Sequence, residues 1–285
     1  MYKRINILVI AIILSFGAFF SGCDIIDPPY TEKQNNGGND TTEKVRKILL
    51  EDFTGFTCKN CPIAHRIVSN LKEAFGERLV VISIHAGGYA EPTTEHPYDF
   101  RTEAGTELDE FFGVSAIGNP NGMVCRKEIS GNRVLGPYQW ESAINDLIDL
   151  EPGLLINLAP AYNETSREIS VDVEVEYLAE GSPNHHLSVF MIEDHVIEYQ
   201  LDKEADPPDV EDYDHRHVMR GSMNGTWGDQ LKTSVIASGE KFNRSFTYTI
   251  PQDSDWDPDN MYIIAFVHDK ENSYEVLQVQ EEHLK

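Results

Sequence analysis

Short apolar runs alternate with helical periodicity in the part of the chain between residues 45 and 150. The runs at 47–53 and 78–85 are typical of buried strands. Between them, one face of a helix over 61–76 would collect the apolar residues Ile63, Ile67, Leu71, Ala74 and Phe75. Gly76 favours an end to that helix, because glycine readily adopts the conformations in which helices terminate.

The same part of the chain continues with two further helices and a pair of strands. The pattern predicts helices at 98–113 and 138–150, and two strands around a Ser-Gly-Asn turn within 121–135. The resulting order is strand, helix, strand, helix, strand, strand, helix, which is typical of an α/β domain. We therefore expect one domain over residues 45–150.

The pattern changes to alternation of apolar and polar residues after Gly153. Several short alternating runs, separated by Pro, Gly, Asn and Asp, predict an antiparallel, immunoglobulin-like β-sandwich over residues 154–285. The acidic segment 198–217 interrupts these runs, and we expect it to be a surface loop. The pattern thus predicts an α/β domain followed by an all-β domain.

The N-terminus carries the features of an exported, lipid-anchored protein. Residues 1–22 hold two basic residues, an uncharged apolar run and small residues before Cys23, as secretory signal peptides do. The apolar run is too short to cross a bilayer as a helix. The sequence Phe-Ser-Gly-Cys resembles the lipobox of bacterial lipoproteins, which implies that acyl chains such as palmitate on Cys23 anchor the protein in a membrane. Residues 23–44 are mostly polar, which predicts a flexible tether.

The charge of the chain excludes one class of partner. There are 48 acidic and 23 basic residues, which gives a formal net charge of −25. Such a protein repels a phosphate backbone, so we expect no nucleic-acid partner. The segment that starts at Asp253 alternates aspartates as calcium loops do. Proline and isoleucine stand where an EF-hand needs glycine and glutamate, so we expect a solvated turn.

Three cysteines remain besides Cys23, namely Cys58, Cys61 and Cys125. Cys58 and Cys61 form a Cys-x-x-Cys pair, and no second such pair or spaced histidine pair completes the ligands of a zinc site. We therefore expect no metal and no other cofactor. Exported proteins keep structural disulfides, yet a pair three residues apart closes a small loop and removes little unfolded-state entropy. The spacing is consistent with either a structural disulfide or a redox centre. It favours the redox centre.

The order of strand, helix and cysteines in the first domain resembles the thioredoxin fold. The resemblance implies that Cys58 attacks and Cys61 resolves a mixed disulfide, and that Pro120 is the cis-proline that shapes the peptide groove. It also implies that Asp52 takes the proton of Cys61, with Glu51 in that role if the strand register is shifted by one. Since free N–H groups at a helix start favour the thiolate, we expect Cys58 to be the accessible, acidic thiol.

A wider set of motifs extends the resemblance to the whole chain. The lipobox and four further segments resemble outer-membrane lipoproteins related to the 28-kilodalton outer membrane protein of Gram-negative anaerobes. The segments are LLEDFTGFTCKNCP, GVSAIGNPNGMVCRK, DYDHRHVMRGSMNGTWGDQL and YIIAFVHD. The resemblance implies a thioredoxin-like domain, a β-sandwich and lipid anchoring at the outer membrane, on the periplasmic face or the cell surface. Members of that family have been linked to surface adhesion.

Five further residues are weaker candidates. We expect Cys125 to be a small buried core residue rather than a third redox cysteine. His215 and His217 alternate and would share a strand face, where we expect surface hydrogen bonding rather than metal binding. His85 and His96 flank a loop near the predicted active-site edge. Contact with a substrate is the less favoured interpretation of these two residues.

Two functions from different classes follow. The first is thiol–disulfide exchange on proteins of the envelope or the exterior, carried by Cys58, Cys61, Asp52 and Pro120. The second is a surface binding protein, adhesin-like, in which the sandwich contacts its partner and the first domain is a scaffold with an inert disulfide. Either function needs a protein partner, and lipid on Cys23 would supply the contact with the membrane.

Overall fold

The structure of the chain is a computed structural model that describes residues 44–285. The predicted signal peptide, the lipidation site Cys23 and the tether up to residue 43 lie outside the described residues. Within the described part, strands are more common than helices, and the sheets contain both parallel and antiparallel pairs. No helix between residues 44 and 285 is long and apolar enough to cross a membrane.

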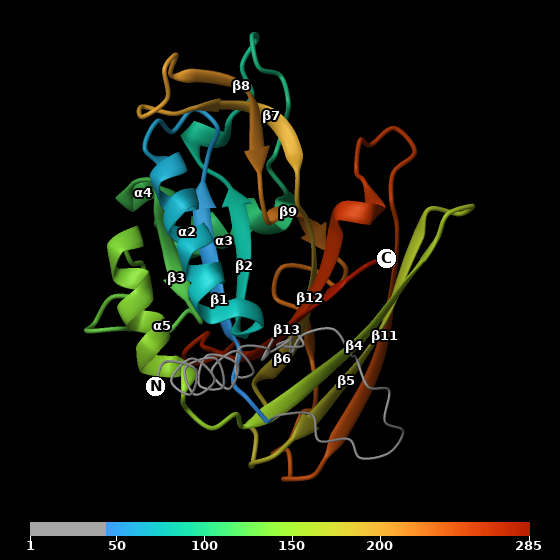
Figure 1. The fold of residues 1–285 in the computed structure, drawn as a ribbon. Helices are drawn as coiled ribbons and strands as arrows, with labels where there is room; N and C mark the ends of the chain where they lie inside the picture. The colour runs from blue at the N-terminus through green and yellow to red at the C-terminus, as the bar shows by residue number, and fades with distance from the viewer. Residues whose placement is uncertain (1–43) are drawn as a thin grey trace, which may run out of the picture. The chain divides into compact units, whose positions relative to one another are not determined.

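The first part of the chain folds into elements close to those that the pattern predicts. β1 and β2 are parallel, and β3 pairs antiparallel with β1 on its other side (Figure 1). Gly76, with a φ of 56°, ends α2 as expected. The elements are β1 Ile48–Thr54, α2 Cys61–Phe75, η1 Gly76–Arg78, β2 Leu79–His85, η2 Gly88–Ala90, α3 Glu103–Phe112, α4 Val114–Ile117, β3 Asn121–Val124, η3 Pro137–Gln139 and α5 Trp140–Ile148.

Two helices differ from the prediction in detail. Of the five apolar residues predicted to form the buried face of α2, only Leu71 is buried. Ala64 and Val68, each one residue beyond a predicted position, are buried instead. The burial of Cys61 at the helix start accounts for this rotation, because residues three or four apart share one side of a helix. α3 begins later than predicted, since the Thr102 side chain caps its N-terminus.

Segment 121–135 forms one strand, β3, instead of the two predicted. Cys125 and Arg126 have φ values of 48° and 51°, so the chain turns away as soon as β3 ends. Beyond that turn, Leu135 returns to the sheet, where it forms an isolated bridge with Gly122. The predicted second strand is therefore wrong, because positive φ angles at two successive residues interrupt the extended backbone.

The second part of the described chain consists of strands and a short 3-10 helix. Burial alternates along β5, whereas β6 and β12 are buried at almost every position. The acidic segment 198–217, predicted to be a surface loop, instead forms most of a hairpin of β7 and β8. The elements are β4 Leu154–Asn163, β5 Glu168–Tyr177, β6 His185–Glu193, β7 Val196–Leu201, β8 Asp209–His215, β9 Val218–Ser222, β10 Asp229–Gln230, β11 Lys241–Thr249, η4 Pro258–Asn260, β12 Met261–Asp269 and β13 Val276–His283.

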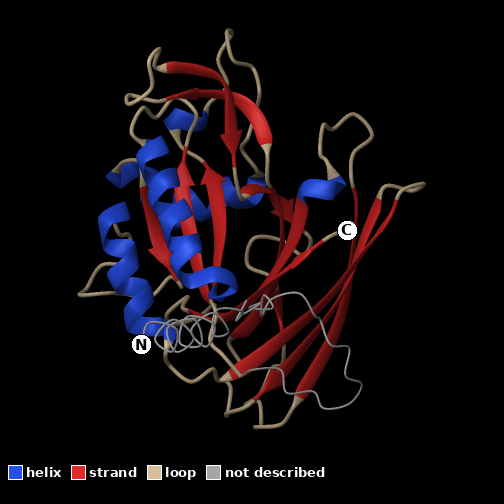
Figure 2. Ribbon diagram, viewed as in Figure 1, coloured by secondary structure: helices blue, strands red, loops and turns tan. Residues whose placement is uncertain are grey.

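One sheet connects the two parts of the chain. Its strand order is β13-β12-β6-β9-β2-β1-β3, and β10 also pairs with β6. The two parts join where Ser83 of β2 pairs with Val218 of β9. A second sheet contains β4, β5 and β11, and a third contains β7 and β8. Figure 2 shows the longer helices gathered around β1, β2 and β3, away from β4, β5 and β11.

Two apolar cores lie on opposite faces of β6 and β12. Phe190 and Ile264 belong to the core shared with β1 and β2, whereas Val189 and Ala265 belong to the core shared with β4 and β5. Burial on both faces explains why β6 and β12 lack alternation. The predicted boundary at 151–153 falls between α5 and β4, but the described residues group in one compact unit, and the division into two domains stays a prediction.

Candidate functional site

The Cys-x-x-Cys pair is a disulfide in the turn between β1 and α2. Cys58 and Cys61 are bonded, with their Cα atoms 5.4 Å apart. α2 begins at Cys61, as the pattern predicts, so Cys58 lies three residues before the helix. The side chain of the N-cap residue, Asn60, makes no capping hydrogen bond. The turn still places both sulfurs near the N-terminal end of α2, where the helix dipole favours negative charge.

A neighbouring loop holds this turn in place. The backbone N–H and the hydroxyl of Thr57 both donate hydrogen bonds to the carbonyl of Tyr89, at 3.1 and 2.9 Å. Gly55 allows the two segments to approach, since a Cβ at this position would lie 2.5 Å from the backbone of Tyr89. Backbone contacts thus fix the disulfide turn in addition to the bond between the sulfurs.

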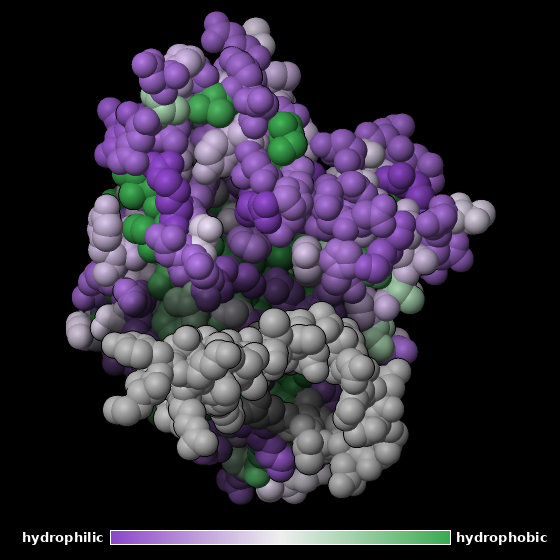
Figure 3. Space-filling view, in the orientation of Figure 1, coloured by the Kyte–Doolittle hydropathy of each residue, from purple (hydrophilic) through white to green (hydrophobic). Residues whose placement is uncertain are grey.

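The β7–β8 hairpin lies against the same turn, at the end of the sheet where β1 ends (Figure 1). The N–H of Leu201 donates to the carbonyl of Phe56 at 2.8 Å, and the N–H of Lys203 donates to the carbonyl of Lys59 at 3.1 Å. The upper part of the molecule, where the hairpin lies, is mainly hydrophilic in the view of Figure 3. A polar outer surface explains why the pattern predicts a loop here.

Neither cysteine is open to solvent. Cys58 is 3% exposed and Cys61 is 0% exposed. The buried side chain of Gln200, in β7, donates from Nε2 to the carbonyl of Cys58 at 3.3 Å. The expectation that Cys58 is accessible is therefore wrong for this structure, and the hairpin that contacts its turn was not predicted.

Two consecutive acids of β1 are both buried, but their surroundings differ. Glu51 pairs with Arg126, whose Nη2 lies 2.6 Å from Oε1, and both side chains are 0% exposed. Asp52 is also 0% exposed, yet neither carboxylate oxygen has a hydrogen-bond partner among the described residues. Burial raises the pKa of Asp52 to about 7. Asp52 can therefore exchange a proton near neutral pH, whereas the carboxylate of Glu51 is paired with Arg126.

Asp52 lines a cavity of about 460 Å³, together with residues of α2, β2 and segment 213–217. His85 also lines it and is buried, and neither of its ring nitrogens has a partner among the described residues. Burial lowers the pKa of His85 well below its usual range, and that of His215 to about 4. The expected surface position of His215 is thus wrong. Neither cysteine is among the described residues that line the cavity.

Two residues of α2 that the sequence did not suggest connect the helix to the hairpin. His65 lies between two hydroxyls, with Nδ1 2.8 Å from Tyr213 and Nε2 2.9 Å from Thr54. Arg66 donates from Nη1 to Oδ2 of Asp202 at 2.9 Å. Tyr213 and Asp202 are 148 and 136 residues away in the sequence, so no local pattern could reveal these contacts.

Pro120 lies between α4 and β3, and the Asn119–Pro120 peptide bond is cis. The next residue, Asn121, begins β3 and pairs with Phe53 of β1. This pairing places Pro120 near the end of β1, from which the disulfide turn departs. The structure therefore brings Pro120 and the disulfide to the same end of the sheet.

The remaining candidate residues, Cys125, His217 and His96, lie beside other groups of the protein. Cys125 is a free, buried thiol in the first core, as predicted, and burial raises its pKa. His217 lies between β8 and β9, and its Nδ1 is 3.3 Å from the carboxylate of Asp194. His96 stacks on Tyr199 with ring centroids 3.5 Å apart. A contact with a substrate at His96 stays a prediction.

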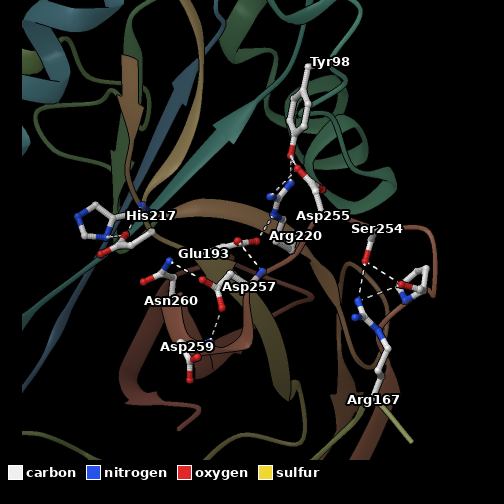
Figure 4. A network of polar contacts seen from close by, with 12 residues as sticks. Tyr98, Arg167, Glu193, His217, Arg220, Ser254, Asp255, Asp257, Asp259 and Asn260 are labelled. Carbon is white, nitrogen blue, oxygen red and sulfur yellow. Dashed lines mark hydrogen bonds and ion pairs between the residues drawn. The ribbon is translucent and has the colours of Figure 1, made fainter. Parts of the chain in front are cut away.

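The aspartate-rich segment before β12 is tied into a polar network (Figure 4). Arg220 of β9 donates to Glu193 of β6 and to the hydroxyl of Tyr98, at 2.7 Å in both cases. Tyr98 donates to Asp255 at 2.7 Å, and the N–H of Asp257 donates to Glu193 at 2.9 Å. Within residues 44–285, no group of three or more His, Cys, Asp or Glu side chains could hold a metal ion.

The fold and the site define a protein of mixed sheets and helices, with a Cys-x-x-Cys disulfide at the N-terminal end of a helix that packs on a buried strand. Residues 106–285, more than half of the chain, match the model of the family described as outer membrane protein Omp28. The chain belongs to the Omp28 family of outer membrane proteins, which confirms the resemblance seen in the motifs. The match begins after the disulfide and Asp52, so it assigns no role to them.

Solved structures add a likeness in fold. HBP35 of Porphyromonas gingivalis aligns with a TM-score of 0.61 and 18% sequence identity, over 84% of this chain and 76% of that one. At this identity the likeness shows a shared fold alone. A domain of the outer membrane lipoprotein Omp28 from Porphyromonas gingivalis aligns with 21% identity and a TM-score of 0.31, over 46% of this chain and 86% of that one. A comparison with curated proteins found no match.

Proposed function

We propose that this Omp28 family member is a thiol–disulfide exchange protein, with a thioredoxin-like first part and an immunoglobulin-like sandwich as its second part. The observation that carries the proposal is the Cys58–Cys61 disulfide near the start of α2, with Asp52, an acid without a partner among residues 44–285, in the preceding strand. A buried acid without a partner destabilises a fold, and such groups concentrate at functional sites. Pro120, at the same end of the sheet, would help to shape the substrate groove.

The substrate of the proposed reaction is a protein dithiol. One substrate thiolate attacks the sulfur of Cys58, and a mixed disulfide forms while the bond to Cys61 breaks. Cys61 leaves as a thiolate and takes up the proton that Asp52 holds below about pH 7. The second substrate thiolate attacks the mixed disulfide and releases Cys58. The substrate ends as a disulfide, and the two protons that its thiols release to solvent return to Cys58 and Asp52, so the protein ends as a dithiol.

The direct test of exchange is to trap the mixed disulfide. Cys61→Ser leaves Cys58 without a resolving partner, so incubation with a disulfide-containing model peptide should produce an adduct that mass spectrometry locates on Cys58. Cys58→Ser is the matched control, because Cys61, the remaining thiol of the pair, is fully buried and should form no adduct. The exchange proposal fails if the two variants give the same result.

The proposed location is the outer membrane, with lipid on Cys23 as the anchor. The family description and the Phe-Ser-Gly-Cys sequence support this part of the proposal. We expect Cys23→Ser to move the protein from the membrane fraction to a soluble fraction. Continued membrane association that only detergent disrupts would contradict the anchor.

One observation favours a second function, a surface binding protein with a structural disulfide. Both cysteines are buried, and the hairpin covers the turn that carries them. On this alternative the disulfide of the folded protein resists reduction, and the partner binds elsewhere on the chain. Resistance to reduction thus distinguishes the alternative from exchange.

A further inference from the structure

The β7–β8 hairpin is a small structural unit of its own. Its two strands form a separate two-stranded sheet, and such hairpins are marginally stable in isolation. An apolar cluster outside the two main cores joins it to the rest of the molecule. The cluster contains Phe56, Phe100, Val196, Tyr199 and Val218. A unit with so small a core can open locally at a lower free energy than global unfolding requires.

The polar attachments of the hairpin converge on α2 and on the disulfide turn. Arg66 of α2 pairs with two hairpin carboxylates, Asp202 at 2.9 Å and Glu204 at 2.6 Å. His65, the preceding residue of the same helix, contacts the hydroxyl of Tyr213. The Arg66 side chain is 45% exposed, so solvent weakens its ion pairs. The two ion pairs of Arg66 are therefore weak enough to break and re-form.

The disulfide is closed to solvent in this structure, and the hairpin contacts the turn that carries it. A thiolate must reach one sulfur atom to break the bond, and Cys58 and Cys61 are 3% and 0% exposed. Tyr213 and His215, at the end of β8, also line the cavity onto which Asp52 opens. Displacement of the hairpin would therefore open both the disulfide and the buried acid.

We propose that the β7–β8 hairpin is a lid that must leave the disulfide turn before a thiol can reach Cys58. The inference rests on the proposed exchange function, because a lid has a purpose only over a pair that reacts. It also narrows the substrate class. Release of Leu201 and Lys203 would free the carbonyls of Phe56 and Lys59, which an extended polypeptide can bind through its own N–H groups.

The test measures how fast tris(2-carboxyethyl)phosphine reduces the disulfide of the folded, full chain. The phosphine becomes its oxide and supplies both electrons, so no partner protein is needed. Alkylation and mass spectrometry quantify the reduced form. Arg66→Ala removes both ion pairs of the lid, and we expect reduction to become about three- to tenfold faster. Tyr213→Phe removes one hydroxyl and should accelerate reduction about twofold.

Lys241→Ala in β11 is the matched control. Lys241 also pairs with two carboxylates, and its side chain is 47% exposed, close to the 45% of Arg66. We expect this variant to be reduced at the rate of the unmodified protein. The acceleration in Arg66→Ala must also exceed the change in its unfolding equilibrium in urea, which separates lid opening from global unfolding.

Equal reduction rates in the unmodified protein, Arg66→Ala and Tyr213→Phe would overturn the lid. Failure of the exchange function gives a different pattern, because the phosphine reacts without any exchange activity. Faster reduction of Arg66→Ala, combined with no trapped adduct in Cys61→Ser, would support the lid and refute exchange.

Discussion

Each face of β1 carries one buried acid, and the two acids differ in their hydrogen-bond partners. On one face, the carboxylate of Glu51 accepts hydrogen bonds from Nε and Nη2 of Arg126, at 2.9 and 2.6 Å. On the other face, the carboxyl of Asp52 has no partner among the described residues and opens onto a cavity. The two residues are consecutive, so side-chain alternation along a strand separates these environments.

The surroundings of the two acids extend this contrast. The guanidinium of Arg126 lies over the rings of Phe112 and Phe266, 5.5 and 5.1 Å from their centroids. The face of Asp52 instead holds the imidazole of His85, which has no hydrogen-bond partner in the described part of the chain. On the Glu51 face the two buried charges are therefore paired with each other, although Nη1 of Arg126 has no hydrogen-bond partner among the described residues. The Asp52 face keeps polar groups that reduce stability, which is typical of sites retained for chemistry.

The largest predicted effect is on the Glu51 face. Arg126→Met leaves the charge of Glu51 buried without a counter-ion and should lower the free energy of unfolding by roughly 3–5 kcal/mol. Denaturant unfolding measures this loss. Glu51→Leu combined with Arg126→Met removes both charges and should recover most of it. A double variant as unstable as the single one would show that packing, not charge, dominates here.

A smaller effect of opposite sign is predicted for Asp52. Burial raises its folded-state pKa from 3.8 to about 7, so the native state binds more protons between these values. Stability should fall as pH rises through this window, by an upper limit on the order of 4 kcal/mol above pH 7. Asp52→Asn removes this dependence but leaves an amide without a partner, so we expect it to be about 2 kcal/mol more stable than the unmodified protein at pH 8.

Denaturant unfolding at pH 3.5 and pH 8 checks the prediction for Asp52. Most of the advantage of Asp52→Asn should disappear at pH 3.5, where the carboxyl is protonated in the folded state and mostly protonated in the unfolded state. An advantage of the same size at both pH values would mean that ionisation of Asp52 does not cause it.

The smallest effect is predicted for His85. His85→Phe removes a buried ring whose nitrogens lack partners among the described residues and preserves the stack on Phe100, so we expect a gain of about 1 kcal/mol. Ile82→Val, at a fully buried position of the same strand, is the matched control and should lose about 1 kcal/mol. Thermal unfolding of both variants gives the signs. A loss in His85→Phe would mean that the imidazole has a partner, such as water, in the cavity.

Local patterns predict much of the fold around the site. The apolar runs of β1 and β2 and the stop at Gly76 are visible in the sequence, because each depends on neighbouring residues only. The Cys-x-x-Cys pair is likewise found by its spacing. For the two acids, the sequence allows either Glu51 or Asp52 in the site. Only the ion pair with Arg126, 75 residues away, distinguishes them.

The position of the β7–β8 hairpin against the disulfide turn could not be predicted either, because it also depends on contacts between distant parts of the sequence. Segment 198–217 is acidic and contains two consecutive prolines, which favours a loop. Its strand character depends on pairing between β7 and β8 and on backbone hydrogen bonds to Phe56 and Lys59, more than 140 residues earlier. These contacts with the turn of Cys58 are distant in sequence, so local reasoning does not predict a buried Cys58.

The most direct test of the central claim is the reduction potential of the Cys58–Cys61 pair in the folded, full chain. The protein is equilibrated in dithiothreitol buffers of defined potential at pH 7, alkylated, and analysed by mass spectrometry for the fraction reduced. A pair that exchanges with protein thiols should have a potential above about −300 mV. A potential below about −300 mV, or a disulfide that stays oxidised in every buffer while the protein is folded, would contradict the account and favour a structural disulfide in a surface binding protein.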